Sequence, residues 1–275
     1  MNKRNLFFSI ILLTVVIIAT VSLLIFKNES PLNANKENKE SNQGNNIELL
    51  FGSNYISYII EDDTMSFNIF AVQKIKNTTS SVANVIQDVS FNNENIEITE
   101  FSVELGNIYN GYKLINFIVD VKATSNNIEK ADEFIIYFKN GKSKSYDIGE
   151  VSIQNDIGYS QNDIIPEGEY VVSYPFPSLN IKLFNNSKES ITLNKIEDLN
   201  KMINYTFKEN REWKPQEINH ILVSSFDVKN EFDFYTITPI LRYSINGSDY
   251  AYNMPGVIYG IFIPDEEKVK KIISQ

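Results

Sequence analysis

One uninterrupted apolar segment near the start of the chain constrains its organisation more than any other feature. Residues 6–26 read LFFSIILLTVVIIATVSLLIF and carry no charge. At about 1.5 Å per residue, a helix of this length crosses a hydrocarbon core of roughly 30 Å. The sequence therefore predicts a transmembrane helix within a first region, residues 1–27, and the lipid bilayer is the predicted partner of residues 6–26.

The charges that flank this segment predict its direction. Lys3 and Arg4 precede the apolar run, whereas Lys27 and Glu29 follow it and nearly cancel. Basic residues are retained on the cytoplasmic side of a membrane. We therefore expect a single-pass protein of the cell membrane, with a cytoplasmic N-terminus and extracellular C-terminal domains.

A cleaved signal peptide is the alternative reading of the same segment. Signal peptides have a shorter apolar region of roughly 7–15 residues, followed by a small-residue cleavage site. Here the run is longer and ends in bulky side chains, at Leu23, Leu24, Ile25 and Phe26. These two features favour a retained anchor. The chain has no cysteine, which excludes a lipid-modified N-terminal cysteine.

Charge and cysteine content narrow the classes of partner. The chain has 25 Lys and Arg against 35 Asp and Glu; without Lys3, Arg4 and Lys27, 22 cations face 35 anions, a net charge of −13. Such a surface repels nucleic acids and suits a protein or cationic partner. With no cysteine, neither disulfides nor thiol chemistry can operate. Abundant Asn and Ile are typical of an AT-rich genome, which favours a Gram-positive source.

A polar segment and a strand-rich region follow the predicted anchor. Residues 28–46 contain almost no apolar side chain, which predicts a flexible tether. Residues 47–153 then alternate between apolar and polar positions, the pattern of half-buried strands. The alternating positions include Phe101, Val103 and Leu105, then Ile115, Phe117, Val119, Val121 and Ala123, then Phe134, Ile136 and Phe138. Asn110-Gly111 and Asn140-Gly141 suit hairpin turns between them. The fold class is therefore mainly β, and this region is an expected immunoglobulin-like antiparallel β-sandwich.

A second β-rich domain is expected at residues 169–275, after a turn-rich linker at 154–168. Its strongest strand signal is the run 232–245, which Pro239 interrupts and Asn246-Gly247 ends. Two organisations remain open, a second sandwich that repeats the first domain and an α+β domain. The α+β reading depends on short helices, one with a capping box at Asn194 and Glu197 and one at the C-terminus, where acidic residues precede lysines.

No catalytic constellation emerges from the sequence. His220 is the only histidine, and no nucleophile elbow accompanies it. The carboxylate pairs Asp62-Asp63 and Asp132-Glu133 are adjacent in sequence, so on a strand their side chains point apart rather than converge on a substrate. There is also no glycine-rich loop of the phosphate-binding kind. We therefore do not expect an enzyme.

Calcium at the linker is the one cofactor that the residues suggest. Gln154-Asn155-Asp156 recurs as Gln161-Asn162-Asp163, and carboxylate and amide oxygens are ligands that calcium prefers. Asp156 and Asp163 are therefore the candidate metal ligands. Simple turn chemistry accounts for the same residues, because Asn and Asp favour turns.

Aromatic side chains next to turns are the candidate ligand contacts. Tyr109 and Tyr112 flank the hairpin at Asn110-Gly111, Tyr250 and Tyr252 follow another, and Trp213 lies in a polar stretch. Exposed Tyr and Trp bury large areas on binding at a low cost in entropy. Packing within the strands is the alternative role for these residues.

Together these features lead to a functional expectation. We expect a non-enzymatic, membrane-anchored, extracytoplasmic binding or interaction protein of the bacterial cell envelope, acting as an accessory or sensor protein. A structural subunit of a membrane transporter or secretion assembly is the second hypothesis. An envelope enzyme that uses carboxylates is the third, and it requires acids from distant strands to meet in a cleft.

Overall fold

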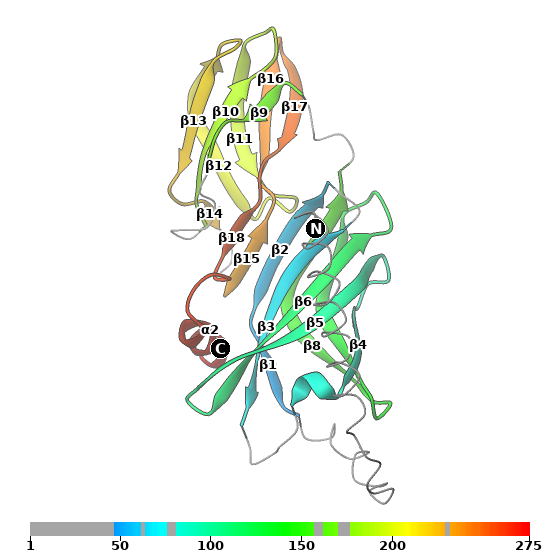
Figure 1. The fold of residues 1–275 in the computed structure, drawn as a ribbon. Helices are drawn as coiled ribbons and strands as arrows, with labels where there is room; N and C mark the ends of the chain where they lie inside the picture. Colours follow the sequence, from blue (N-terminus) through cyan, green and yellow to red (C-terminus); the bar gives the residue numbers. More distant parts are fainter. Residues whose placement is uncertain (1–46, 62–63, 76–80, 157–161, 170–176, 229–231) are drawn as a thin grey trace, which may run out of the picture. The chain divides into compact units, whose positions relative to one another are not determined.

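The computed structural model describes residues 47–61, 64–75, 81–156, 162–169, 177–228 and 232–275. These residues are mainly β, as predicted, and they form several sheets (Figure 1). The predicted anchor (residues 1–27) and tether (28–46) lie outside the described residues. In the described ranges, no helix combines the length and the apolarity needed to cross a membrane.

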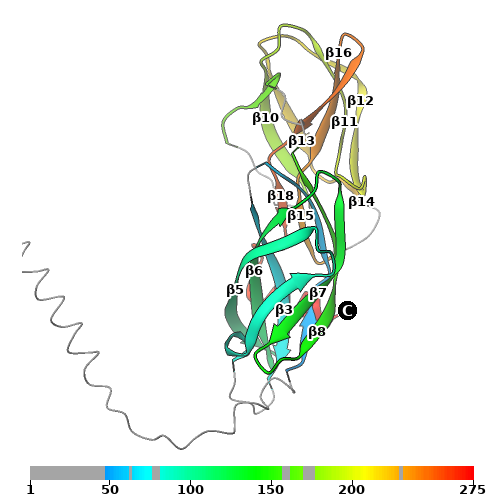
Figure 2. The ribbon, with the colours of Figure 1, turned by 90° about the vertical axis from the view of Figure 1, so that its right-hand side faces the viewer.

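The first of two lobes consists of two sheets that enclose one core (Figure 2). The four-stranded sheet has the order β1 (Leu49–Phe51), β3 (Met65–Lys74), β6 (Tyr112–Ala123) and β5 (Ile96–Tyr109). The six-stranded sheet has the order β18 (Val257–Tyr259), β15 (Phe234–Ile237), β2 (Asn54–Ile60), β8 (Ser143–Asn155), β7 (Glu129–Phe138) and β4 (Ile86–Phe91). A short 3-10 turn at Val82–Asn84 precedes β4.

The predicted alternation determines which side chains fill this core. Ile115, Phe117, Val119 and Val121 of β6 are fully buried, while the residues between them are half-buried. Asn110 and Gly111 both have positive φ and close the β5–β6 hairpin, as predicted. At the second predicted turn only Gly141 has positive φ, and the N–H of Phe138 bonds to the carbonyl of Lys142. Local turn chemistry therefore sets both hairpins.

The six-stranded sheet is not purely antiparallel, which differs from the expected antiparallel sandwich. β2 pairs in parallel with β8 on one side and with β15 on the other. Parallel neighbours must come from distant parts of the chain, because a tight hairpin cannot join them. Gly149 of β8 allows the close approach to β2, since a Cβ there would lie 2.2 Å from the carbonyl oxygen of Asn54.

The second lobe also has two sheets around one core. The three-stranded sheet has the order β13 (Ile218–Val223), β10 (Leu179–Asn185) and β9 (Ile164–Pro166). The five-stranded sheet has the order β14 (Asp227–Val228), β12 (Ile203–Trp213), β11 (Ile191–Glu197), β16 (Ile240–Ile245) and β17 (Ser248–Asn253). The helix predicted from Asn194 and Glu197 was wrong, because both residues belong to strand β11.

A two-stranded ribbon belongs to both lobes. β15 and β16 are consecutive, as are β17 and β18, and the two pairs run antiparallel (Figure 1). Pro239 lies where the first strand of this ribbon leaves the six-stranded sheet and enters the five-stranded sheet. It therefore separates two strands rather than interrupting one, and its carbonyl still accepts the N–H of Met254 across the ribbon.

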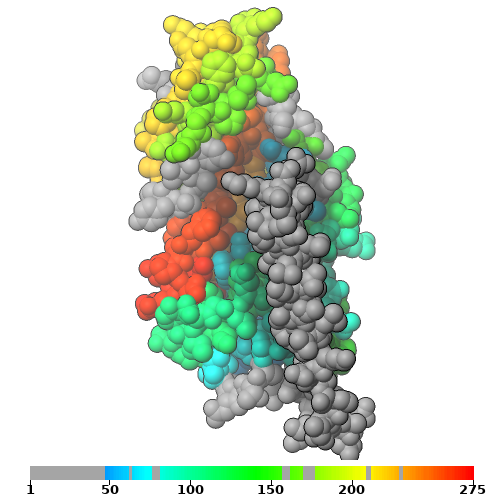
Figure 3. Space-filling view, viewed as in Figure 1, coloured from blue at the N-terminus to red at the C-terminus, as the bar shows by residue number. Residues whose placement is uncertain are grey.

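The C-terminus is a helix, as predicted. α2 (Asp265–Ile273) begins after Pro264 with three acidic residues and carries lysines in its last turn. Its buried face contributes Val269 and Ile272 to a third apolar cluster, with Phe70, Val72 and Leu114. Figure 3 shows the red C-terminal residues beside the atoms of the four-stranded sheet. The domain predicted at 169–275 thus has three elements, β15, β18 and α2, that pair or pack with the first lobe.

Candidate functional site

A polar hollow of the second lobe lies on the outer face of the five-stranded sheet. Its volume is about 740 Å³, within the range of ligand sites, but it is open to solvent. We call it the charged groove. It is lined by Asn194, Lys195, Glu197, Lys201, Thr206, Arg242, Tyr243, Asp249, Tyr250 and Ala251.

A bulge in β11 builds the centre of this groove. The register of β11 shifts between Leu193 and Lys195 with respect to both neighbouring strands. After the shift, Lys195 lies opposite Thr206 of β12 and Arg242 of β16. A bulge adds one residue to a strand and re-aims the side chains that follow it. Lys195 and Glu197 consequently occupy the outer face together, beside Arg242.

Two cations hold one nearly buried carboxylate at this point. Glu197 is 4% exposed; its Oε2 lies 2.6 Å from Lys195 Nζ, and its Oε1 lies 2.9 Å from Arg242 Nε. Burial would raise the pKa of Glu197, but the hydrogen bonds and charges of Lys195 and Arg242 outweigh it and lower the pKa. The carboxylate therefore stays ionised and holds both cations in place.

Two stacked tyrosines lie beside the charged groove: Tyr243 is buried in the core of the lobe, and Tyr250 is half-buried against it. The ring centroids of Tyr243 and Tyr250 are 5.6 Å apart, with an interplanar angle of 22°. The Tyr243 hydroxyl donates to Asp163 Oδ2 at 3.4 Å. Burial first, and the charge of Asp163 second, raise the pKa of Tyr243, so its hydroxyl stays protonated. The buried Tyr243 therefore supports Tyr250, and the pair adds no charge beside the charged centre.

The charge of the charged groove differs in sign from that of the chain. Three cations, Lys195, Lys201 and Arg242, line it together with two anions, Glu197 and Asp249. Lys201 is exposed, while Lys195 and Arg242 keep 40% and 34% of their side chains exposed. Because the whole chain has a net charge of −10, this is a local cationic surface on an acidic protein.

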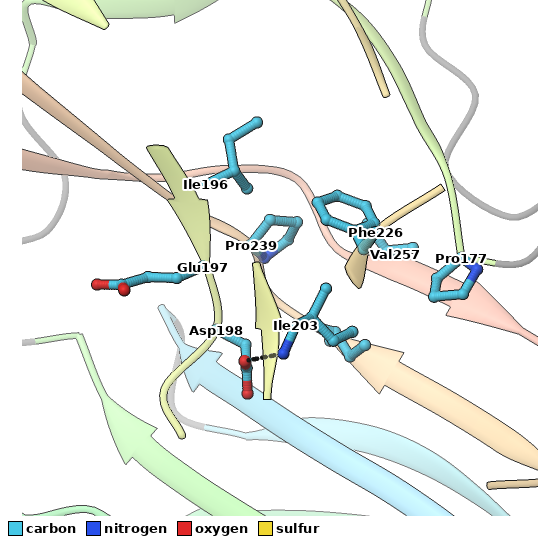
Figure 4. Close-up of a pocket in the computed structure, with 9 residues that line it drawn as sticks. Pro177, Ile196, Glu197, Asp198, Ile203, Phe226, Pro239 and Val257 are labelled. Carbon is cyan, nitrogen blue, oxygen red and sulfur yellow. Dashed lines mark hydrogen bonds between the residues drawn. The ribbon is translucent and has the colours of Figure 1, made fainter. Parts of the chain in front are cut away.

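A second hollow, below Pro239, is too small for a ligand (Figure 4). It is apolar and measures about 10 Å³, the space of about one water molecule. Asp198 at its edge accepts the N–H of Ile203 at 2.8 Å and the hydroxyl of the fully buried Tyr55. Burial is the main cause that raises the pKa of Tyr55. Asp198 is therefore a structural residue that joins β2 of the first lobe to the second.

The structure separates the five predicted aromatic contacts. Tyr250 lines the charged groove, whereas Tyr252 is buried against the core of its lobe. Trp213 is only 2% exposed and its indole N–H donates to the carbonyl of Glu217, so the predicted exposed position was wrong. Tyr109 and Tyr112 face each other across their hairpin and pack, half-buried, against the cluster under α2.

The two predicted calcium ligands contact different elements. The N–H of Asp156 bonds to the carbonyl of Ile60 at the end of β2, while Asp163 contacts Asn186 and Tyr243 in the second lobe. Over the described ranges, no group of three or more His, Cys, Asp or Glu side chains is arranged to hold a metal ion. Calcium at the linker stays a prediction.

Sequence reasoning named Glu197 only as part of a helix cap and did not name Lys195 or Arg242. The bulge sets the buried residues Leu193 and Ile196 three positions apart, and this spacing imitates a helix. The sequence signal for a strand here is the alternation of Ile191 and Leu193, directly before the bulge.

His220, the only histidine, lies on β13 and shares a 2.6 Å hydrogen bond with Asn180.

Comparisons with known proteins assign no family to the chain. No protein-family model matches the sequence, and no curated protein matches it. Among solved structures, dimeric latent PorU from Porphyromonas gingivalis is 12% identical, with a TM-score of 0.24; the match covers 78% of this chain and 20% of PorU. The C-terminal domain of the antigen I/II polypeptide BspA from Streptococcus agalactiae is 8% identical, with a TM-score of 0.22, and the match covers 77% and 98% of the two chains. Similarity of this extent identifies no function.

Proposed function

We propose that this chain is a non-enzymatic, membrane-anchored binding protein of the envelope of a Gram-positive bacterium, with an immunoglobulin-like first lobe. In this proposal the charged groove of the second lobe contacts an acidic segment of a protein partner. The observation that carries it is the local cationic surface around Glu197 on an otherwise acidic chain.

The geometry of the charged groove supports a macromolecular ligand. The hollow is open, and the described residues around Pro239 leave room for about one water molecule only. An extended acidic segment can lie along an open sheet face and reach Lys195, Lys201 and Arg242. Arg242 and Lys195 are already held by Glu197, so binding orders them at little further cost.

The charge distribution supports selectivity for an acidic segment of a protein. The acidic chain as a whole repels polyanions such as nucleic acids, while the charged groove attracts a short anionic segment. Electrostatic complementarity of this kind increases association rates and excludes wrong partners more than it increases affinity. The predicted anchor and tether would present the groove outside the membrane.

A peptide titration tests the proposal on the full chain in detergent. We expect a glutamate-rich peptide to bind, more weakly as salt increases, and a lysine-rich peptide of equal length not to bind at the charged groove. Lys201→Asn should weaken binding by about 1 kcal/mol, roughly fivefold in Kd, because one exposed charge is lost. Asn also tolerates the positive φ of position 201.

A matched control uses an exposed lysine of the first lobe. Lys122 forms a 3.0 Å ion pair with Glu97 and is 40% exposed. Lys122→Asn removes the same charge from the chain and should leave the affinity unchanged. Equal weakening by Lys122→Asn and Lys201→Asn would refute the assignment to the charged groove, as would binding of the glutamate-rich peptide that Lys201→Asn leaves unchanged.

A further inference from the structure

The outermost strand of the three-stranded sheet, β13, presents apolar side chains to solvent. Its residues alternate between buried and exposed positions, and Ile218 and Leu222 are 56% and 62% exposed. His220 lies between them on the same face. Large apolar side chains that gather on one strand of a soluble domain indicate an interaction surface.

Some backbone N–H and C=O groups of β13 also face the open side of this sheet. The N–H of Asn185 bonds to the carbonyl of Glu217, which fixes the phase of the β10–β13 ladder. In an antiparallel pair, successive residues of a strand direct their backbone groups to alternate sides. Asn219 and Ile221 therefore face β10, whereas Ile218 and Leu222 direct their N–H and C=O groups away from it. Among the described strands, none pairs with that side of β13.

The other edge strands carry features that block such pairing, and β13 does not. β1, β9, β14 and β18 have three residues or fewer. The pairings of β4 and β5 contain register shifts, and β17 carries Asp249. Short length, bulges and charges are the usual protections of a sheet edge. β13 has six residues in unbroken register, with no proline and no Asp, Glu, Lys or Arg.

We propose that β13 pairs with β13 of a second copy of this chain, antiparallel and about a twofold axis at His220. In this register Ile218 of each copy lies opposite Leu222 of the other, on the same face of the sheet. The backbone groups of both residues then bond across the axis. The two three-stranded sheets become one sheet of six strands.

Self-complementarity favours a second copy over an unrelated partner. A twofold interface must match a surface with itself, and the two exposed apolar residues of β13 are equally spaced about His220. Acidic residues dominate the chain, yet residues 218–223 contain none, so the repulsion expected between two acidic copies is absent at this edge. This proposal is independent of the ligand of the charged groove.

Disulfide trapping tests the register, because the chain has no cysteine of its own. In the proposed dimer the two copies of residue 220 are directly opposite, with Cα atoms about 5.5 Å apart, inside the roughly 4.4–6.8 Å range of a disulfide. We expect His220→Cys in the full chain, oxidised in detergent, to form a covalent dimer. Lys182→Cys is the control, since Lys182 pairs with His220 one strand inward. Its two copies would lie about 14 Å apart, three strand spacings.

Charge substitution tests the interface without a cysteine. Leu222→Lys should abolish the dimer in sedimentation and the crosslink in the His220→Cys background, because it places a cation on each side of the axis. Ile165→Lys makes a comparable change at an exposed position, 41% accessible, on the opposite edge strand β9 and should leave the dimer intact. Fluorescence of Trp213 verifies that each variant is folded. A monomeric wild type, or equal crosslinking of the two cysteine variants, overturns the proposal.

Discussion

The two lobes are assembled from the chain in different ways. The core of the first lobe comes from β1–β8; from the last 42 residues, β15 and β18 complete its six-stranded sheet and α2 packs on its four-stranded sheet. The second lobe uses the intervening strands, from β9 to β14 with β16 and β17. The first lobe therefore depends on both ends of the described chain, while the second resembles two insertions, one between β8 and β15 and one between β15 and β18.

The two lobes also differ in how their sheet edges and surfaces are protected. In the first lobe, each edge strand is short or has a register shift, and α2 covers apolar residues of the four-stranded sheet. The second lobe carries both the charged groove and the unprotected edge of β13. The first lobe has an open polar hollow of its own, about 820 Å³, lined by Glu61, Lys122 and Asp156 among others, but both surfaces for which we propose partners lie on the second lobe.

The largest expected effect tests the dependence of the first lobe on the C-terminal elements. Phe234 of β15 is 1% exposed and packs against Phe70, with ring centroids 4.9 Å apart and the rings tilted by 51°. Phe234→Ala should lower the free energy of unfolding by about 3–5 kcal/mol, because it leaves a large cavity in that cluster. Urea denaturation followed by circular dichroism measures the loss.

A control and a second probe sharpen this test. Phe262 is 77% exposed, so Phe262→Ala should change the free energy of unfolding by less than about 0.5 kcal/mol. Trp213, the only tryptophan, is buried in the second lobe, and its fluorescence follows that lobe alone. If Phe234→Ala shifts the fluorescence transition but not the transition of the first lobe, the assignment of β15 to the first lobe fails.

A smaller effect is expected at the bond between the lobes. Tyr55→Phe removes the hydroxyl that donates to Asp198 and leaves a carboxylate, 1% exposed, with fewer donors. We expect a loss of about 1–3 kcal/mol, the cost of a buried polar group without its partner. Thermal unfolding should also become less cooperative, since the lobes lose a contact. Tyr137→Phe removes an exposed hydroxyl 3.4 Å from Ser90 and should have almost no effect.

The smallest expected effect concerns the charged groove and depends on pH. The pKa of Glu197 is lowered from its ordinary value of 4.5 in the folded state, so its stabilisation is present above that value and is lost as pH falls through the folded pKa. Glu197→Gln should cost about 1 kcal/mol at pH 7. The difference from wild type should disappear in acid.

Denaturation at neutral and acidic pH measures this difference. Glu100→Gln makes the same substitution at an exposed position of β5 and should show no comparable gap at either pH. A gap for Glu197→Gln that stays constant with pH would contradict the role of its charge. In that case Glu197 would act through packing alone, and its charge would not hold Lys195 and Arg242 in place in the charged groove.

Local patterns predicted local structure well. The alternation in β6 and β7, two Asn-Gly hairpins with positive φ at both residues and the C-terminal helix all depend on neighbours in sequence, and the structure contains them. Pairing between distant segments was not predictable in this way. Nothing in the residues of β15 indicates that it lies parallel to β2, 180 residues earlier.

The candidate site was predicted only in part, for two physical reasons. Tyr250 was named because tyrosine follows a turn there, but Lys195 and Arg242 were not, since the bulge in β11 hides a strand behind helical spacing. Trp213 was misplaced because its neighbours in sequence are polar while its own side chain points inward. The polarity of a stretch reflects its exposed side chains and does not show that one residue among them is buried.

The parallel pairing of β2 with β15 has a mechanical consequence. A load applied between Ile47, just before β1, and the second lobe pulls β2 from its N-terminal side and β15 from its C-terminal side, where β16 begins. Two parallel strands pulled in this way are loaded in shear, so their hydrogen bonds share the force and do not open one after another. Thr238 adds to this connection, since its N–H bonds to Ser57 and its hydroxyl accepts the N–H of Ile59. The lobes are thus joined by paired strands that resist tension along the chain.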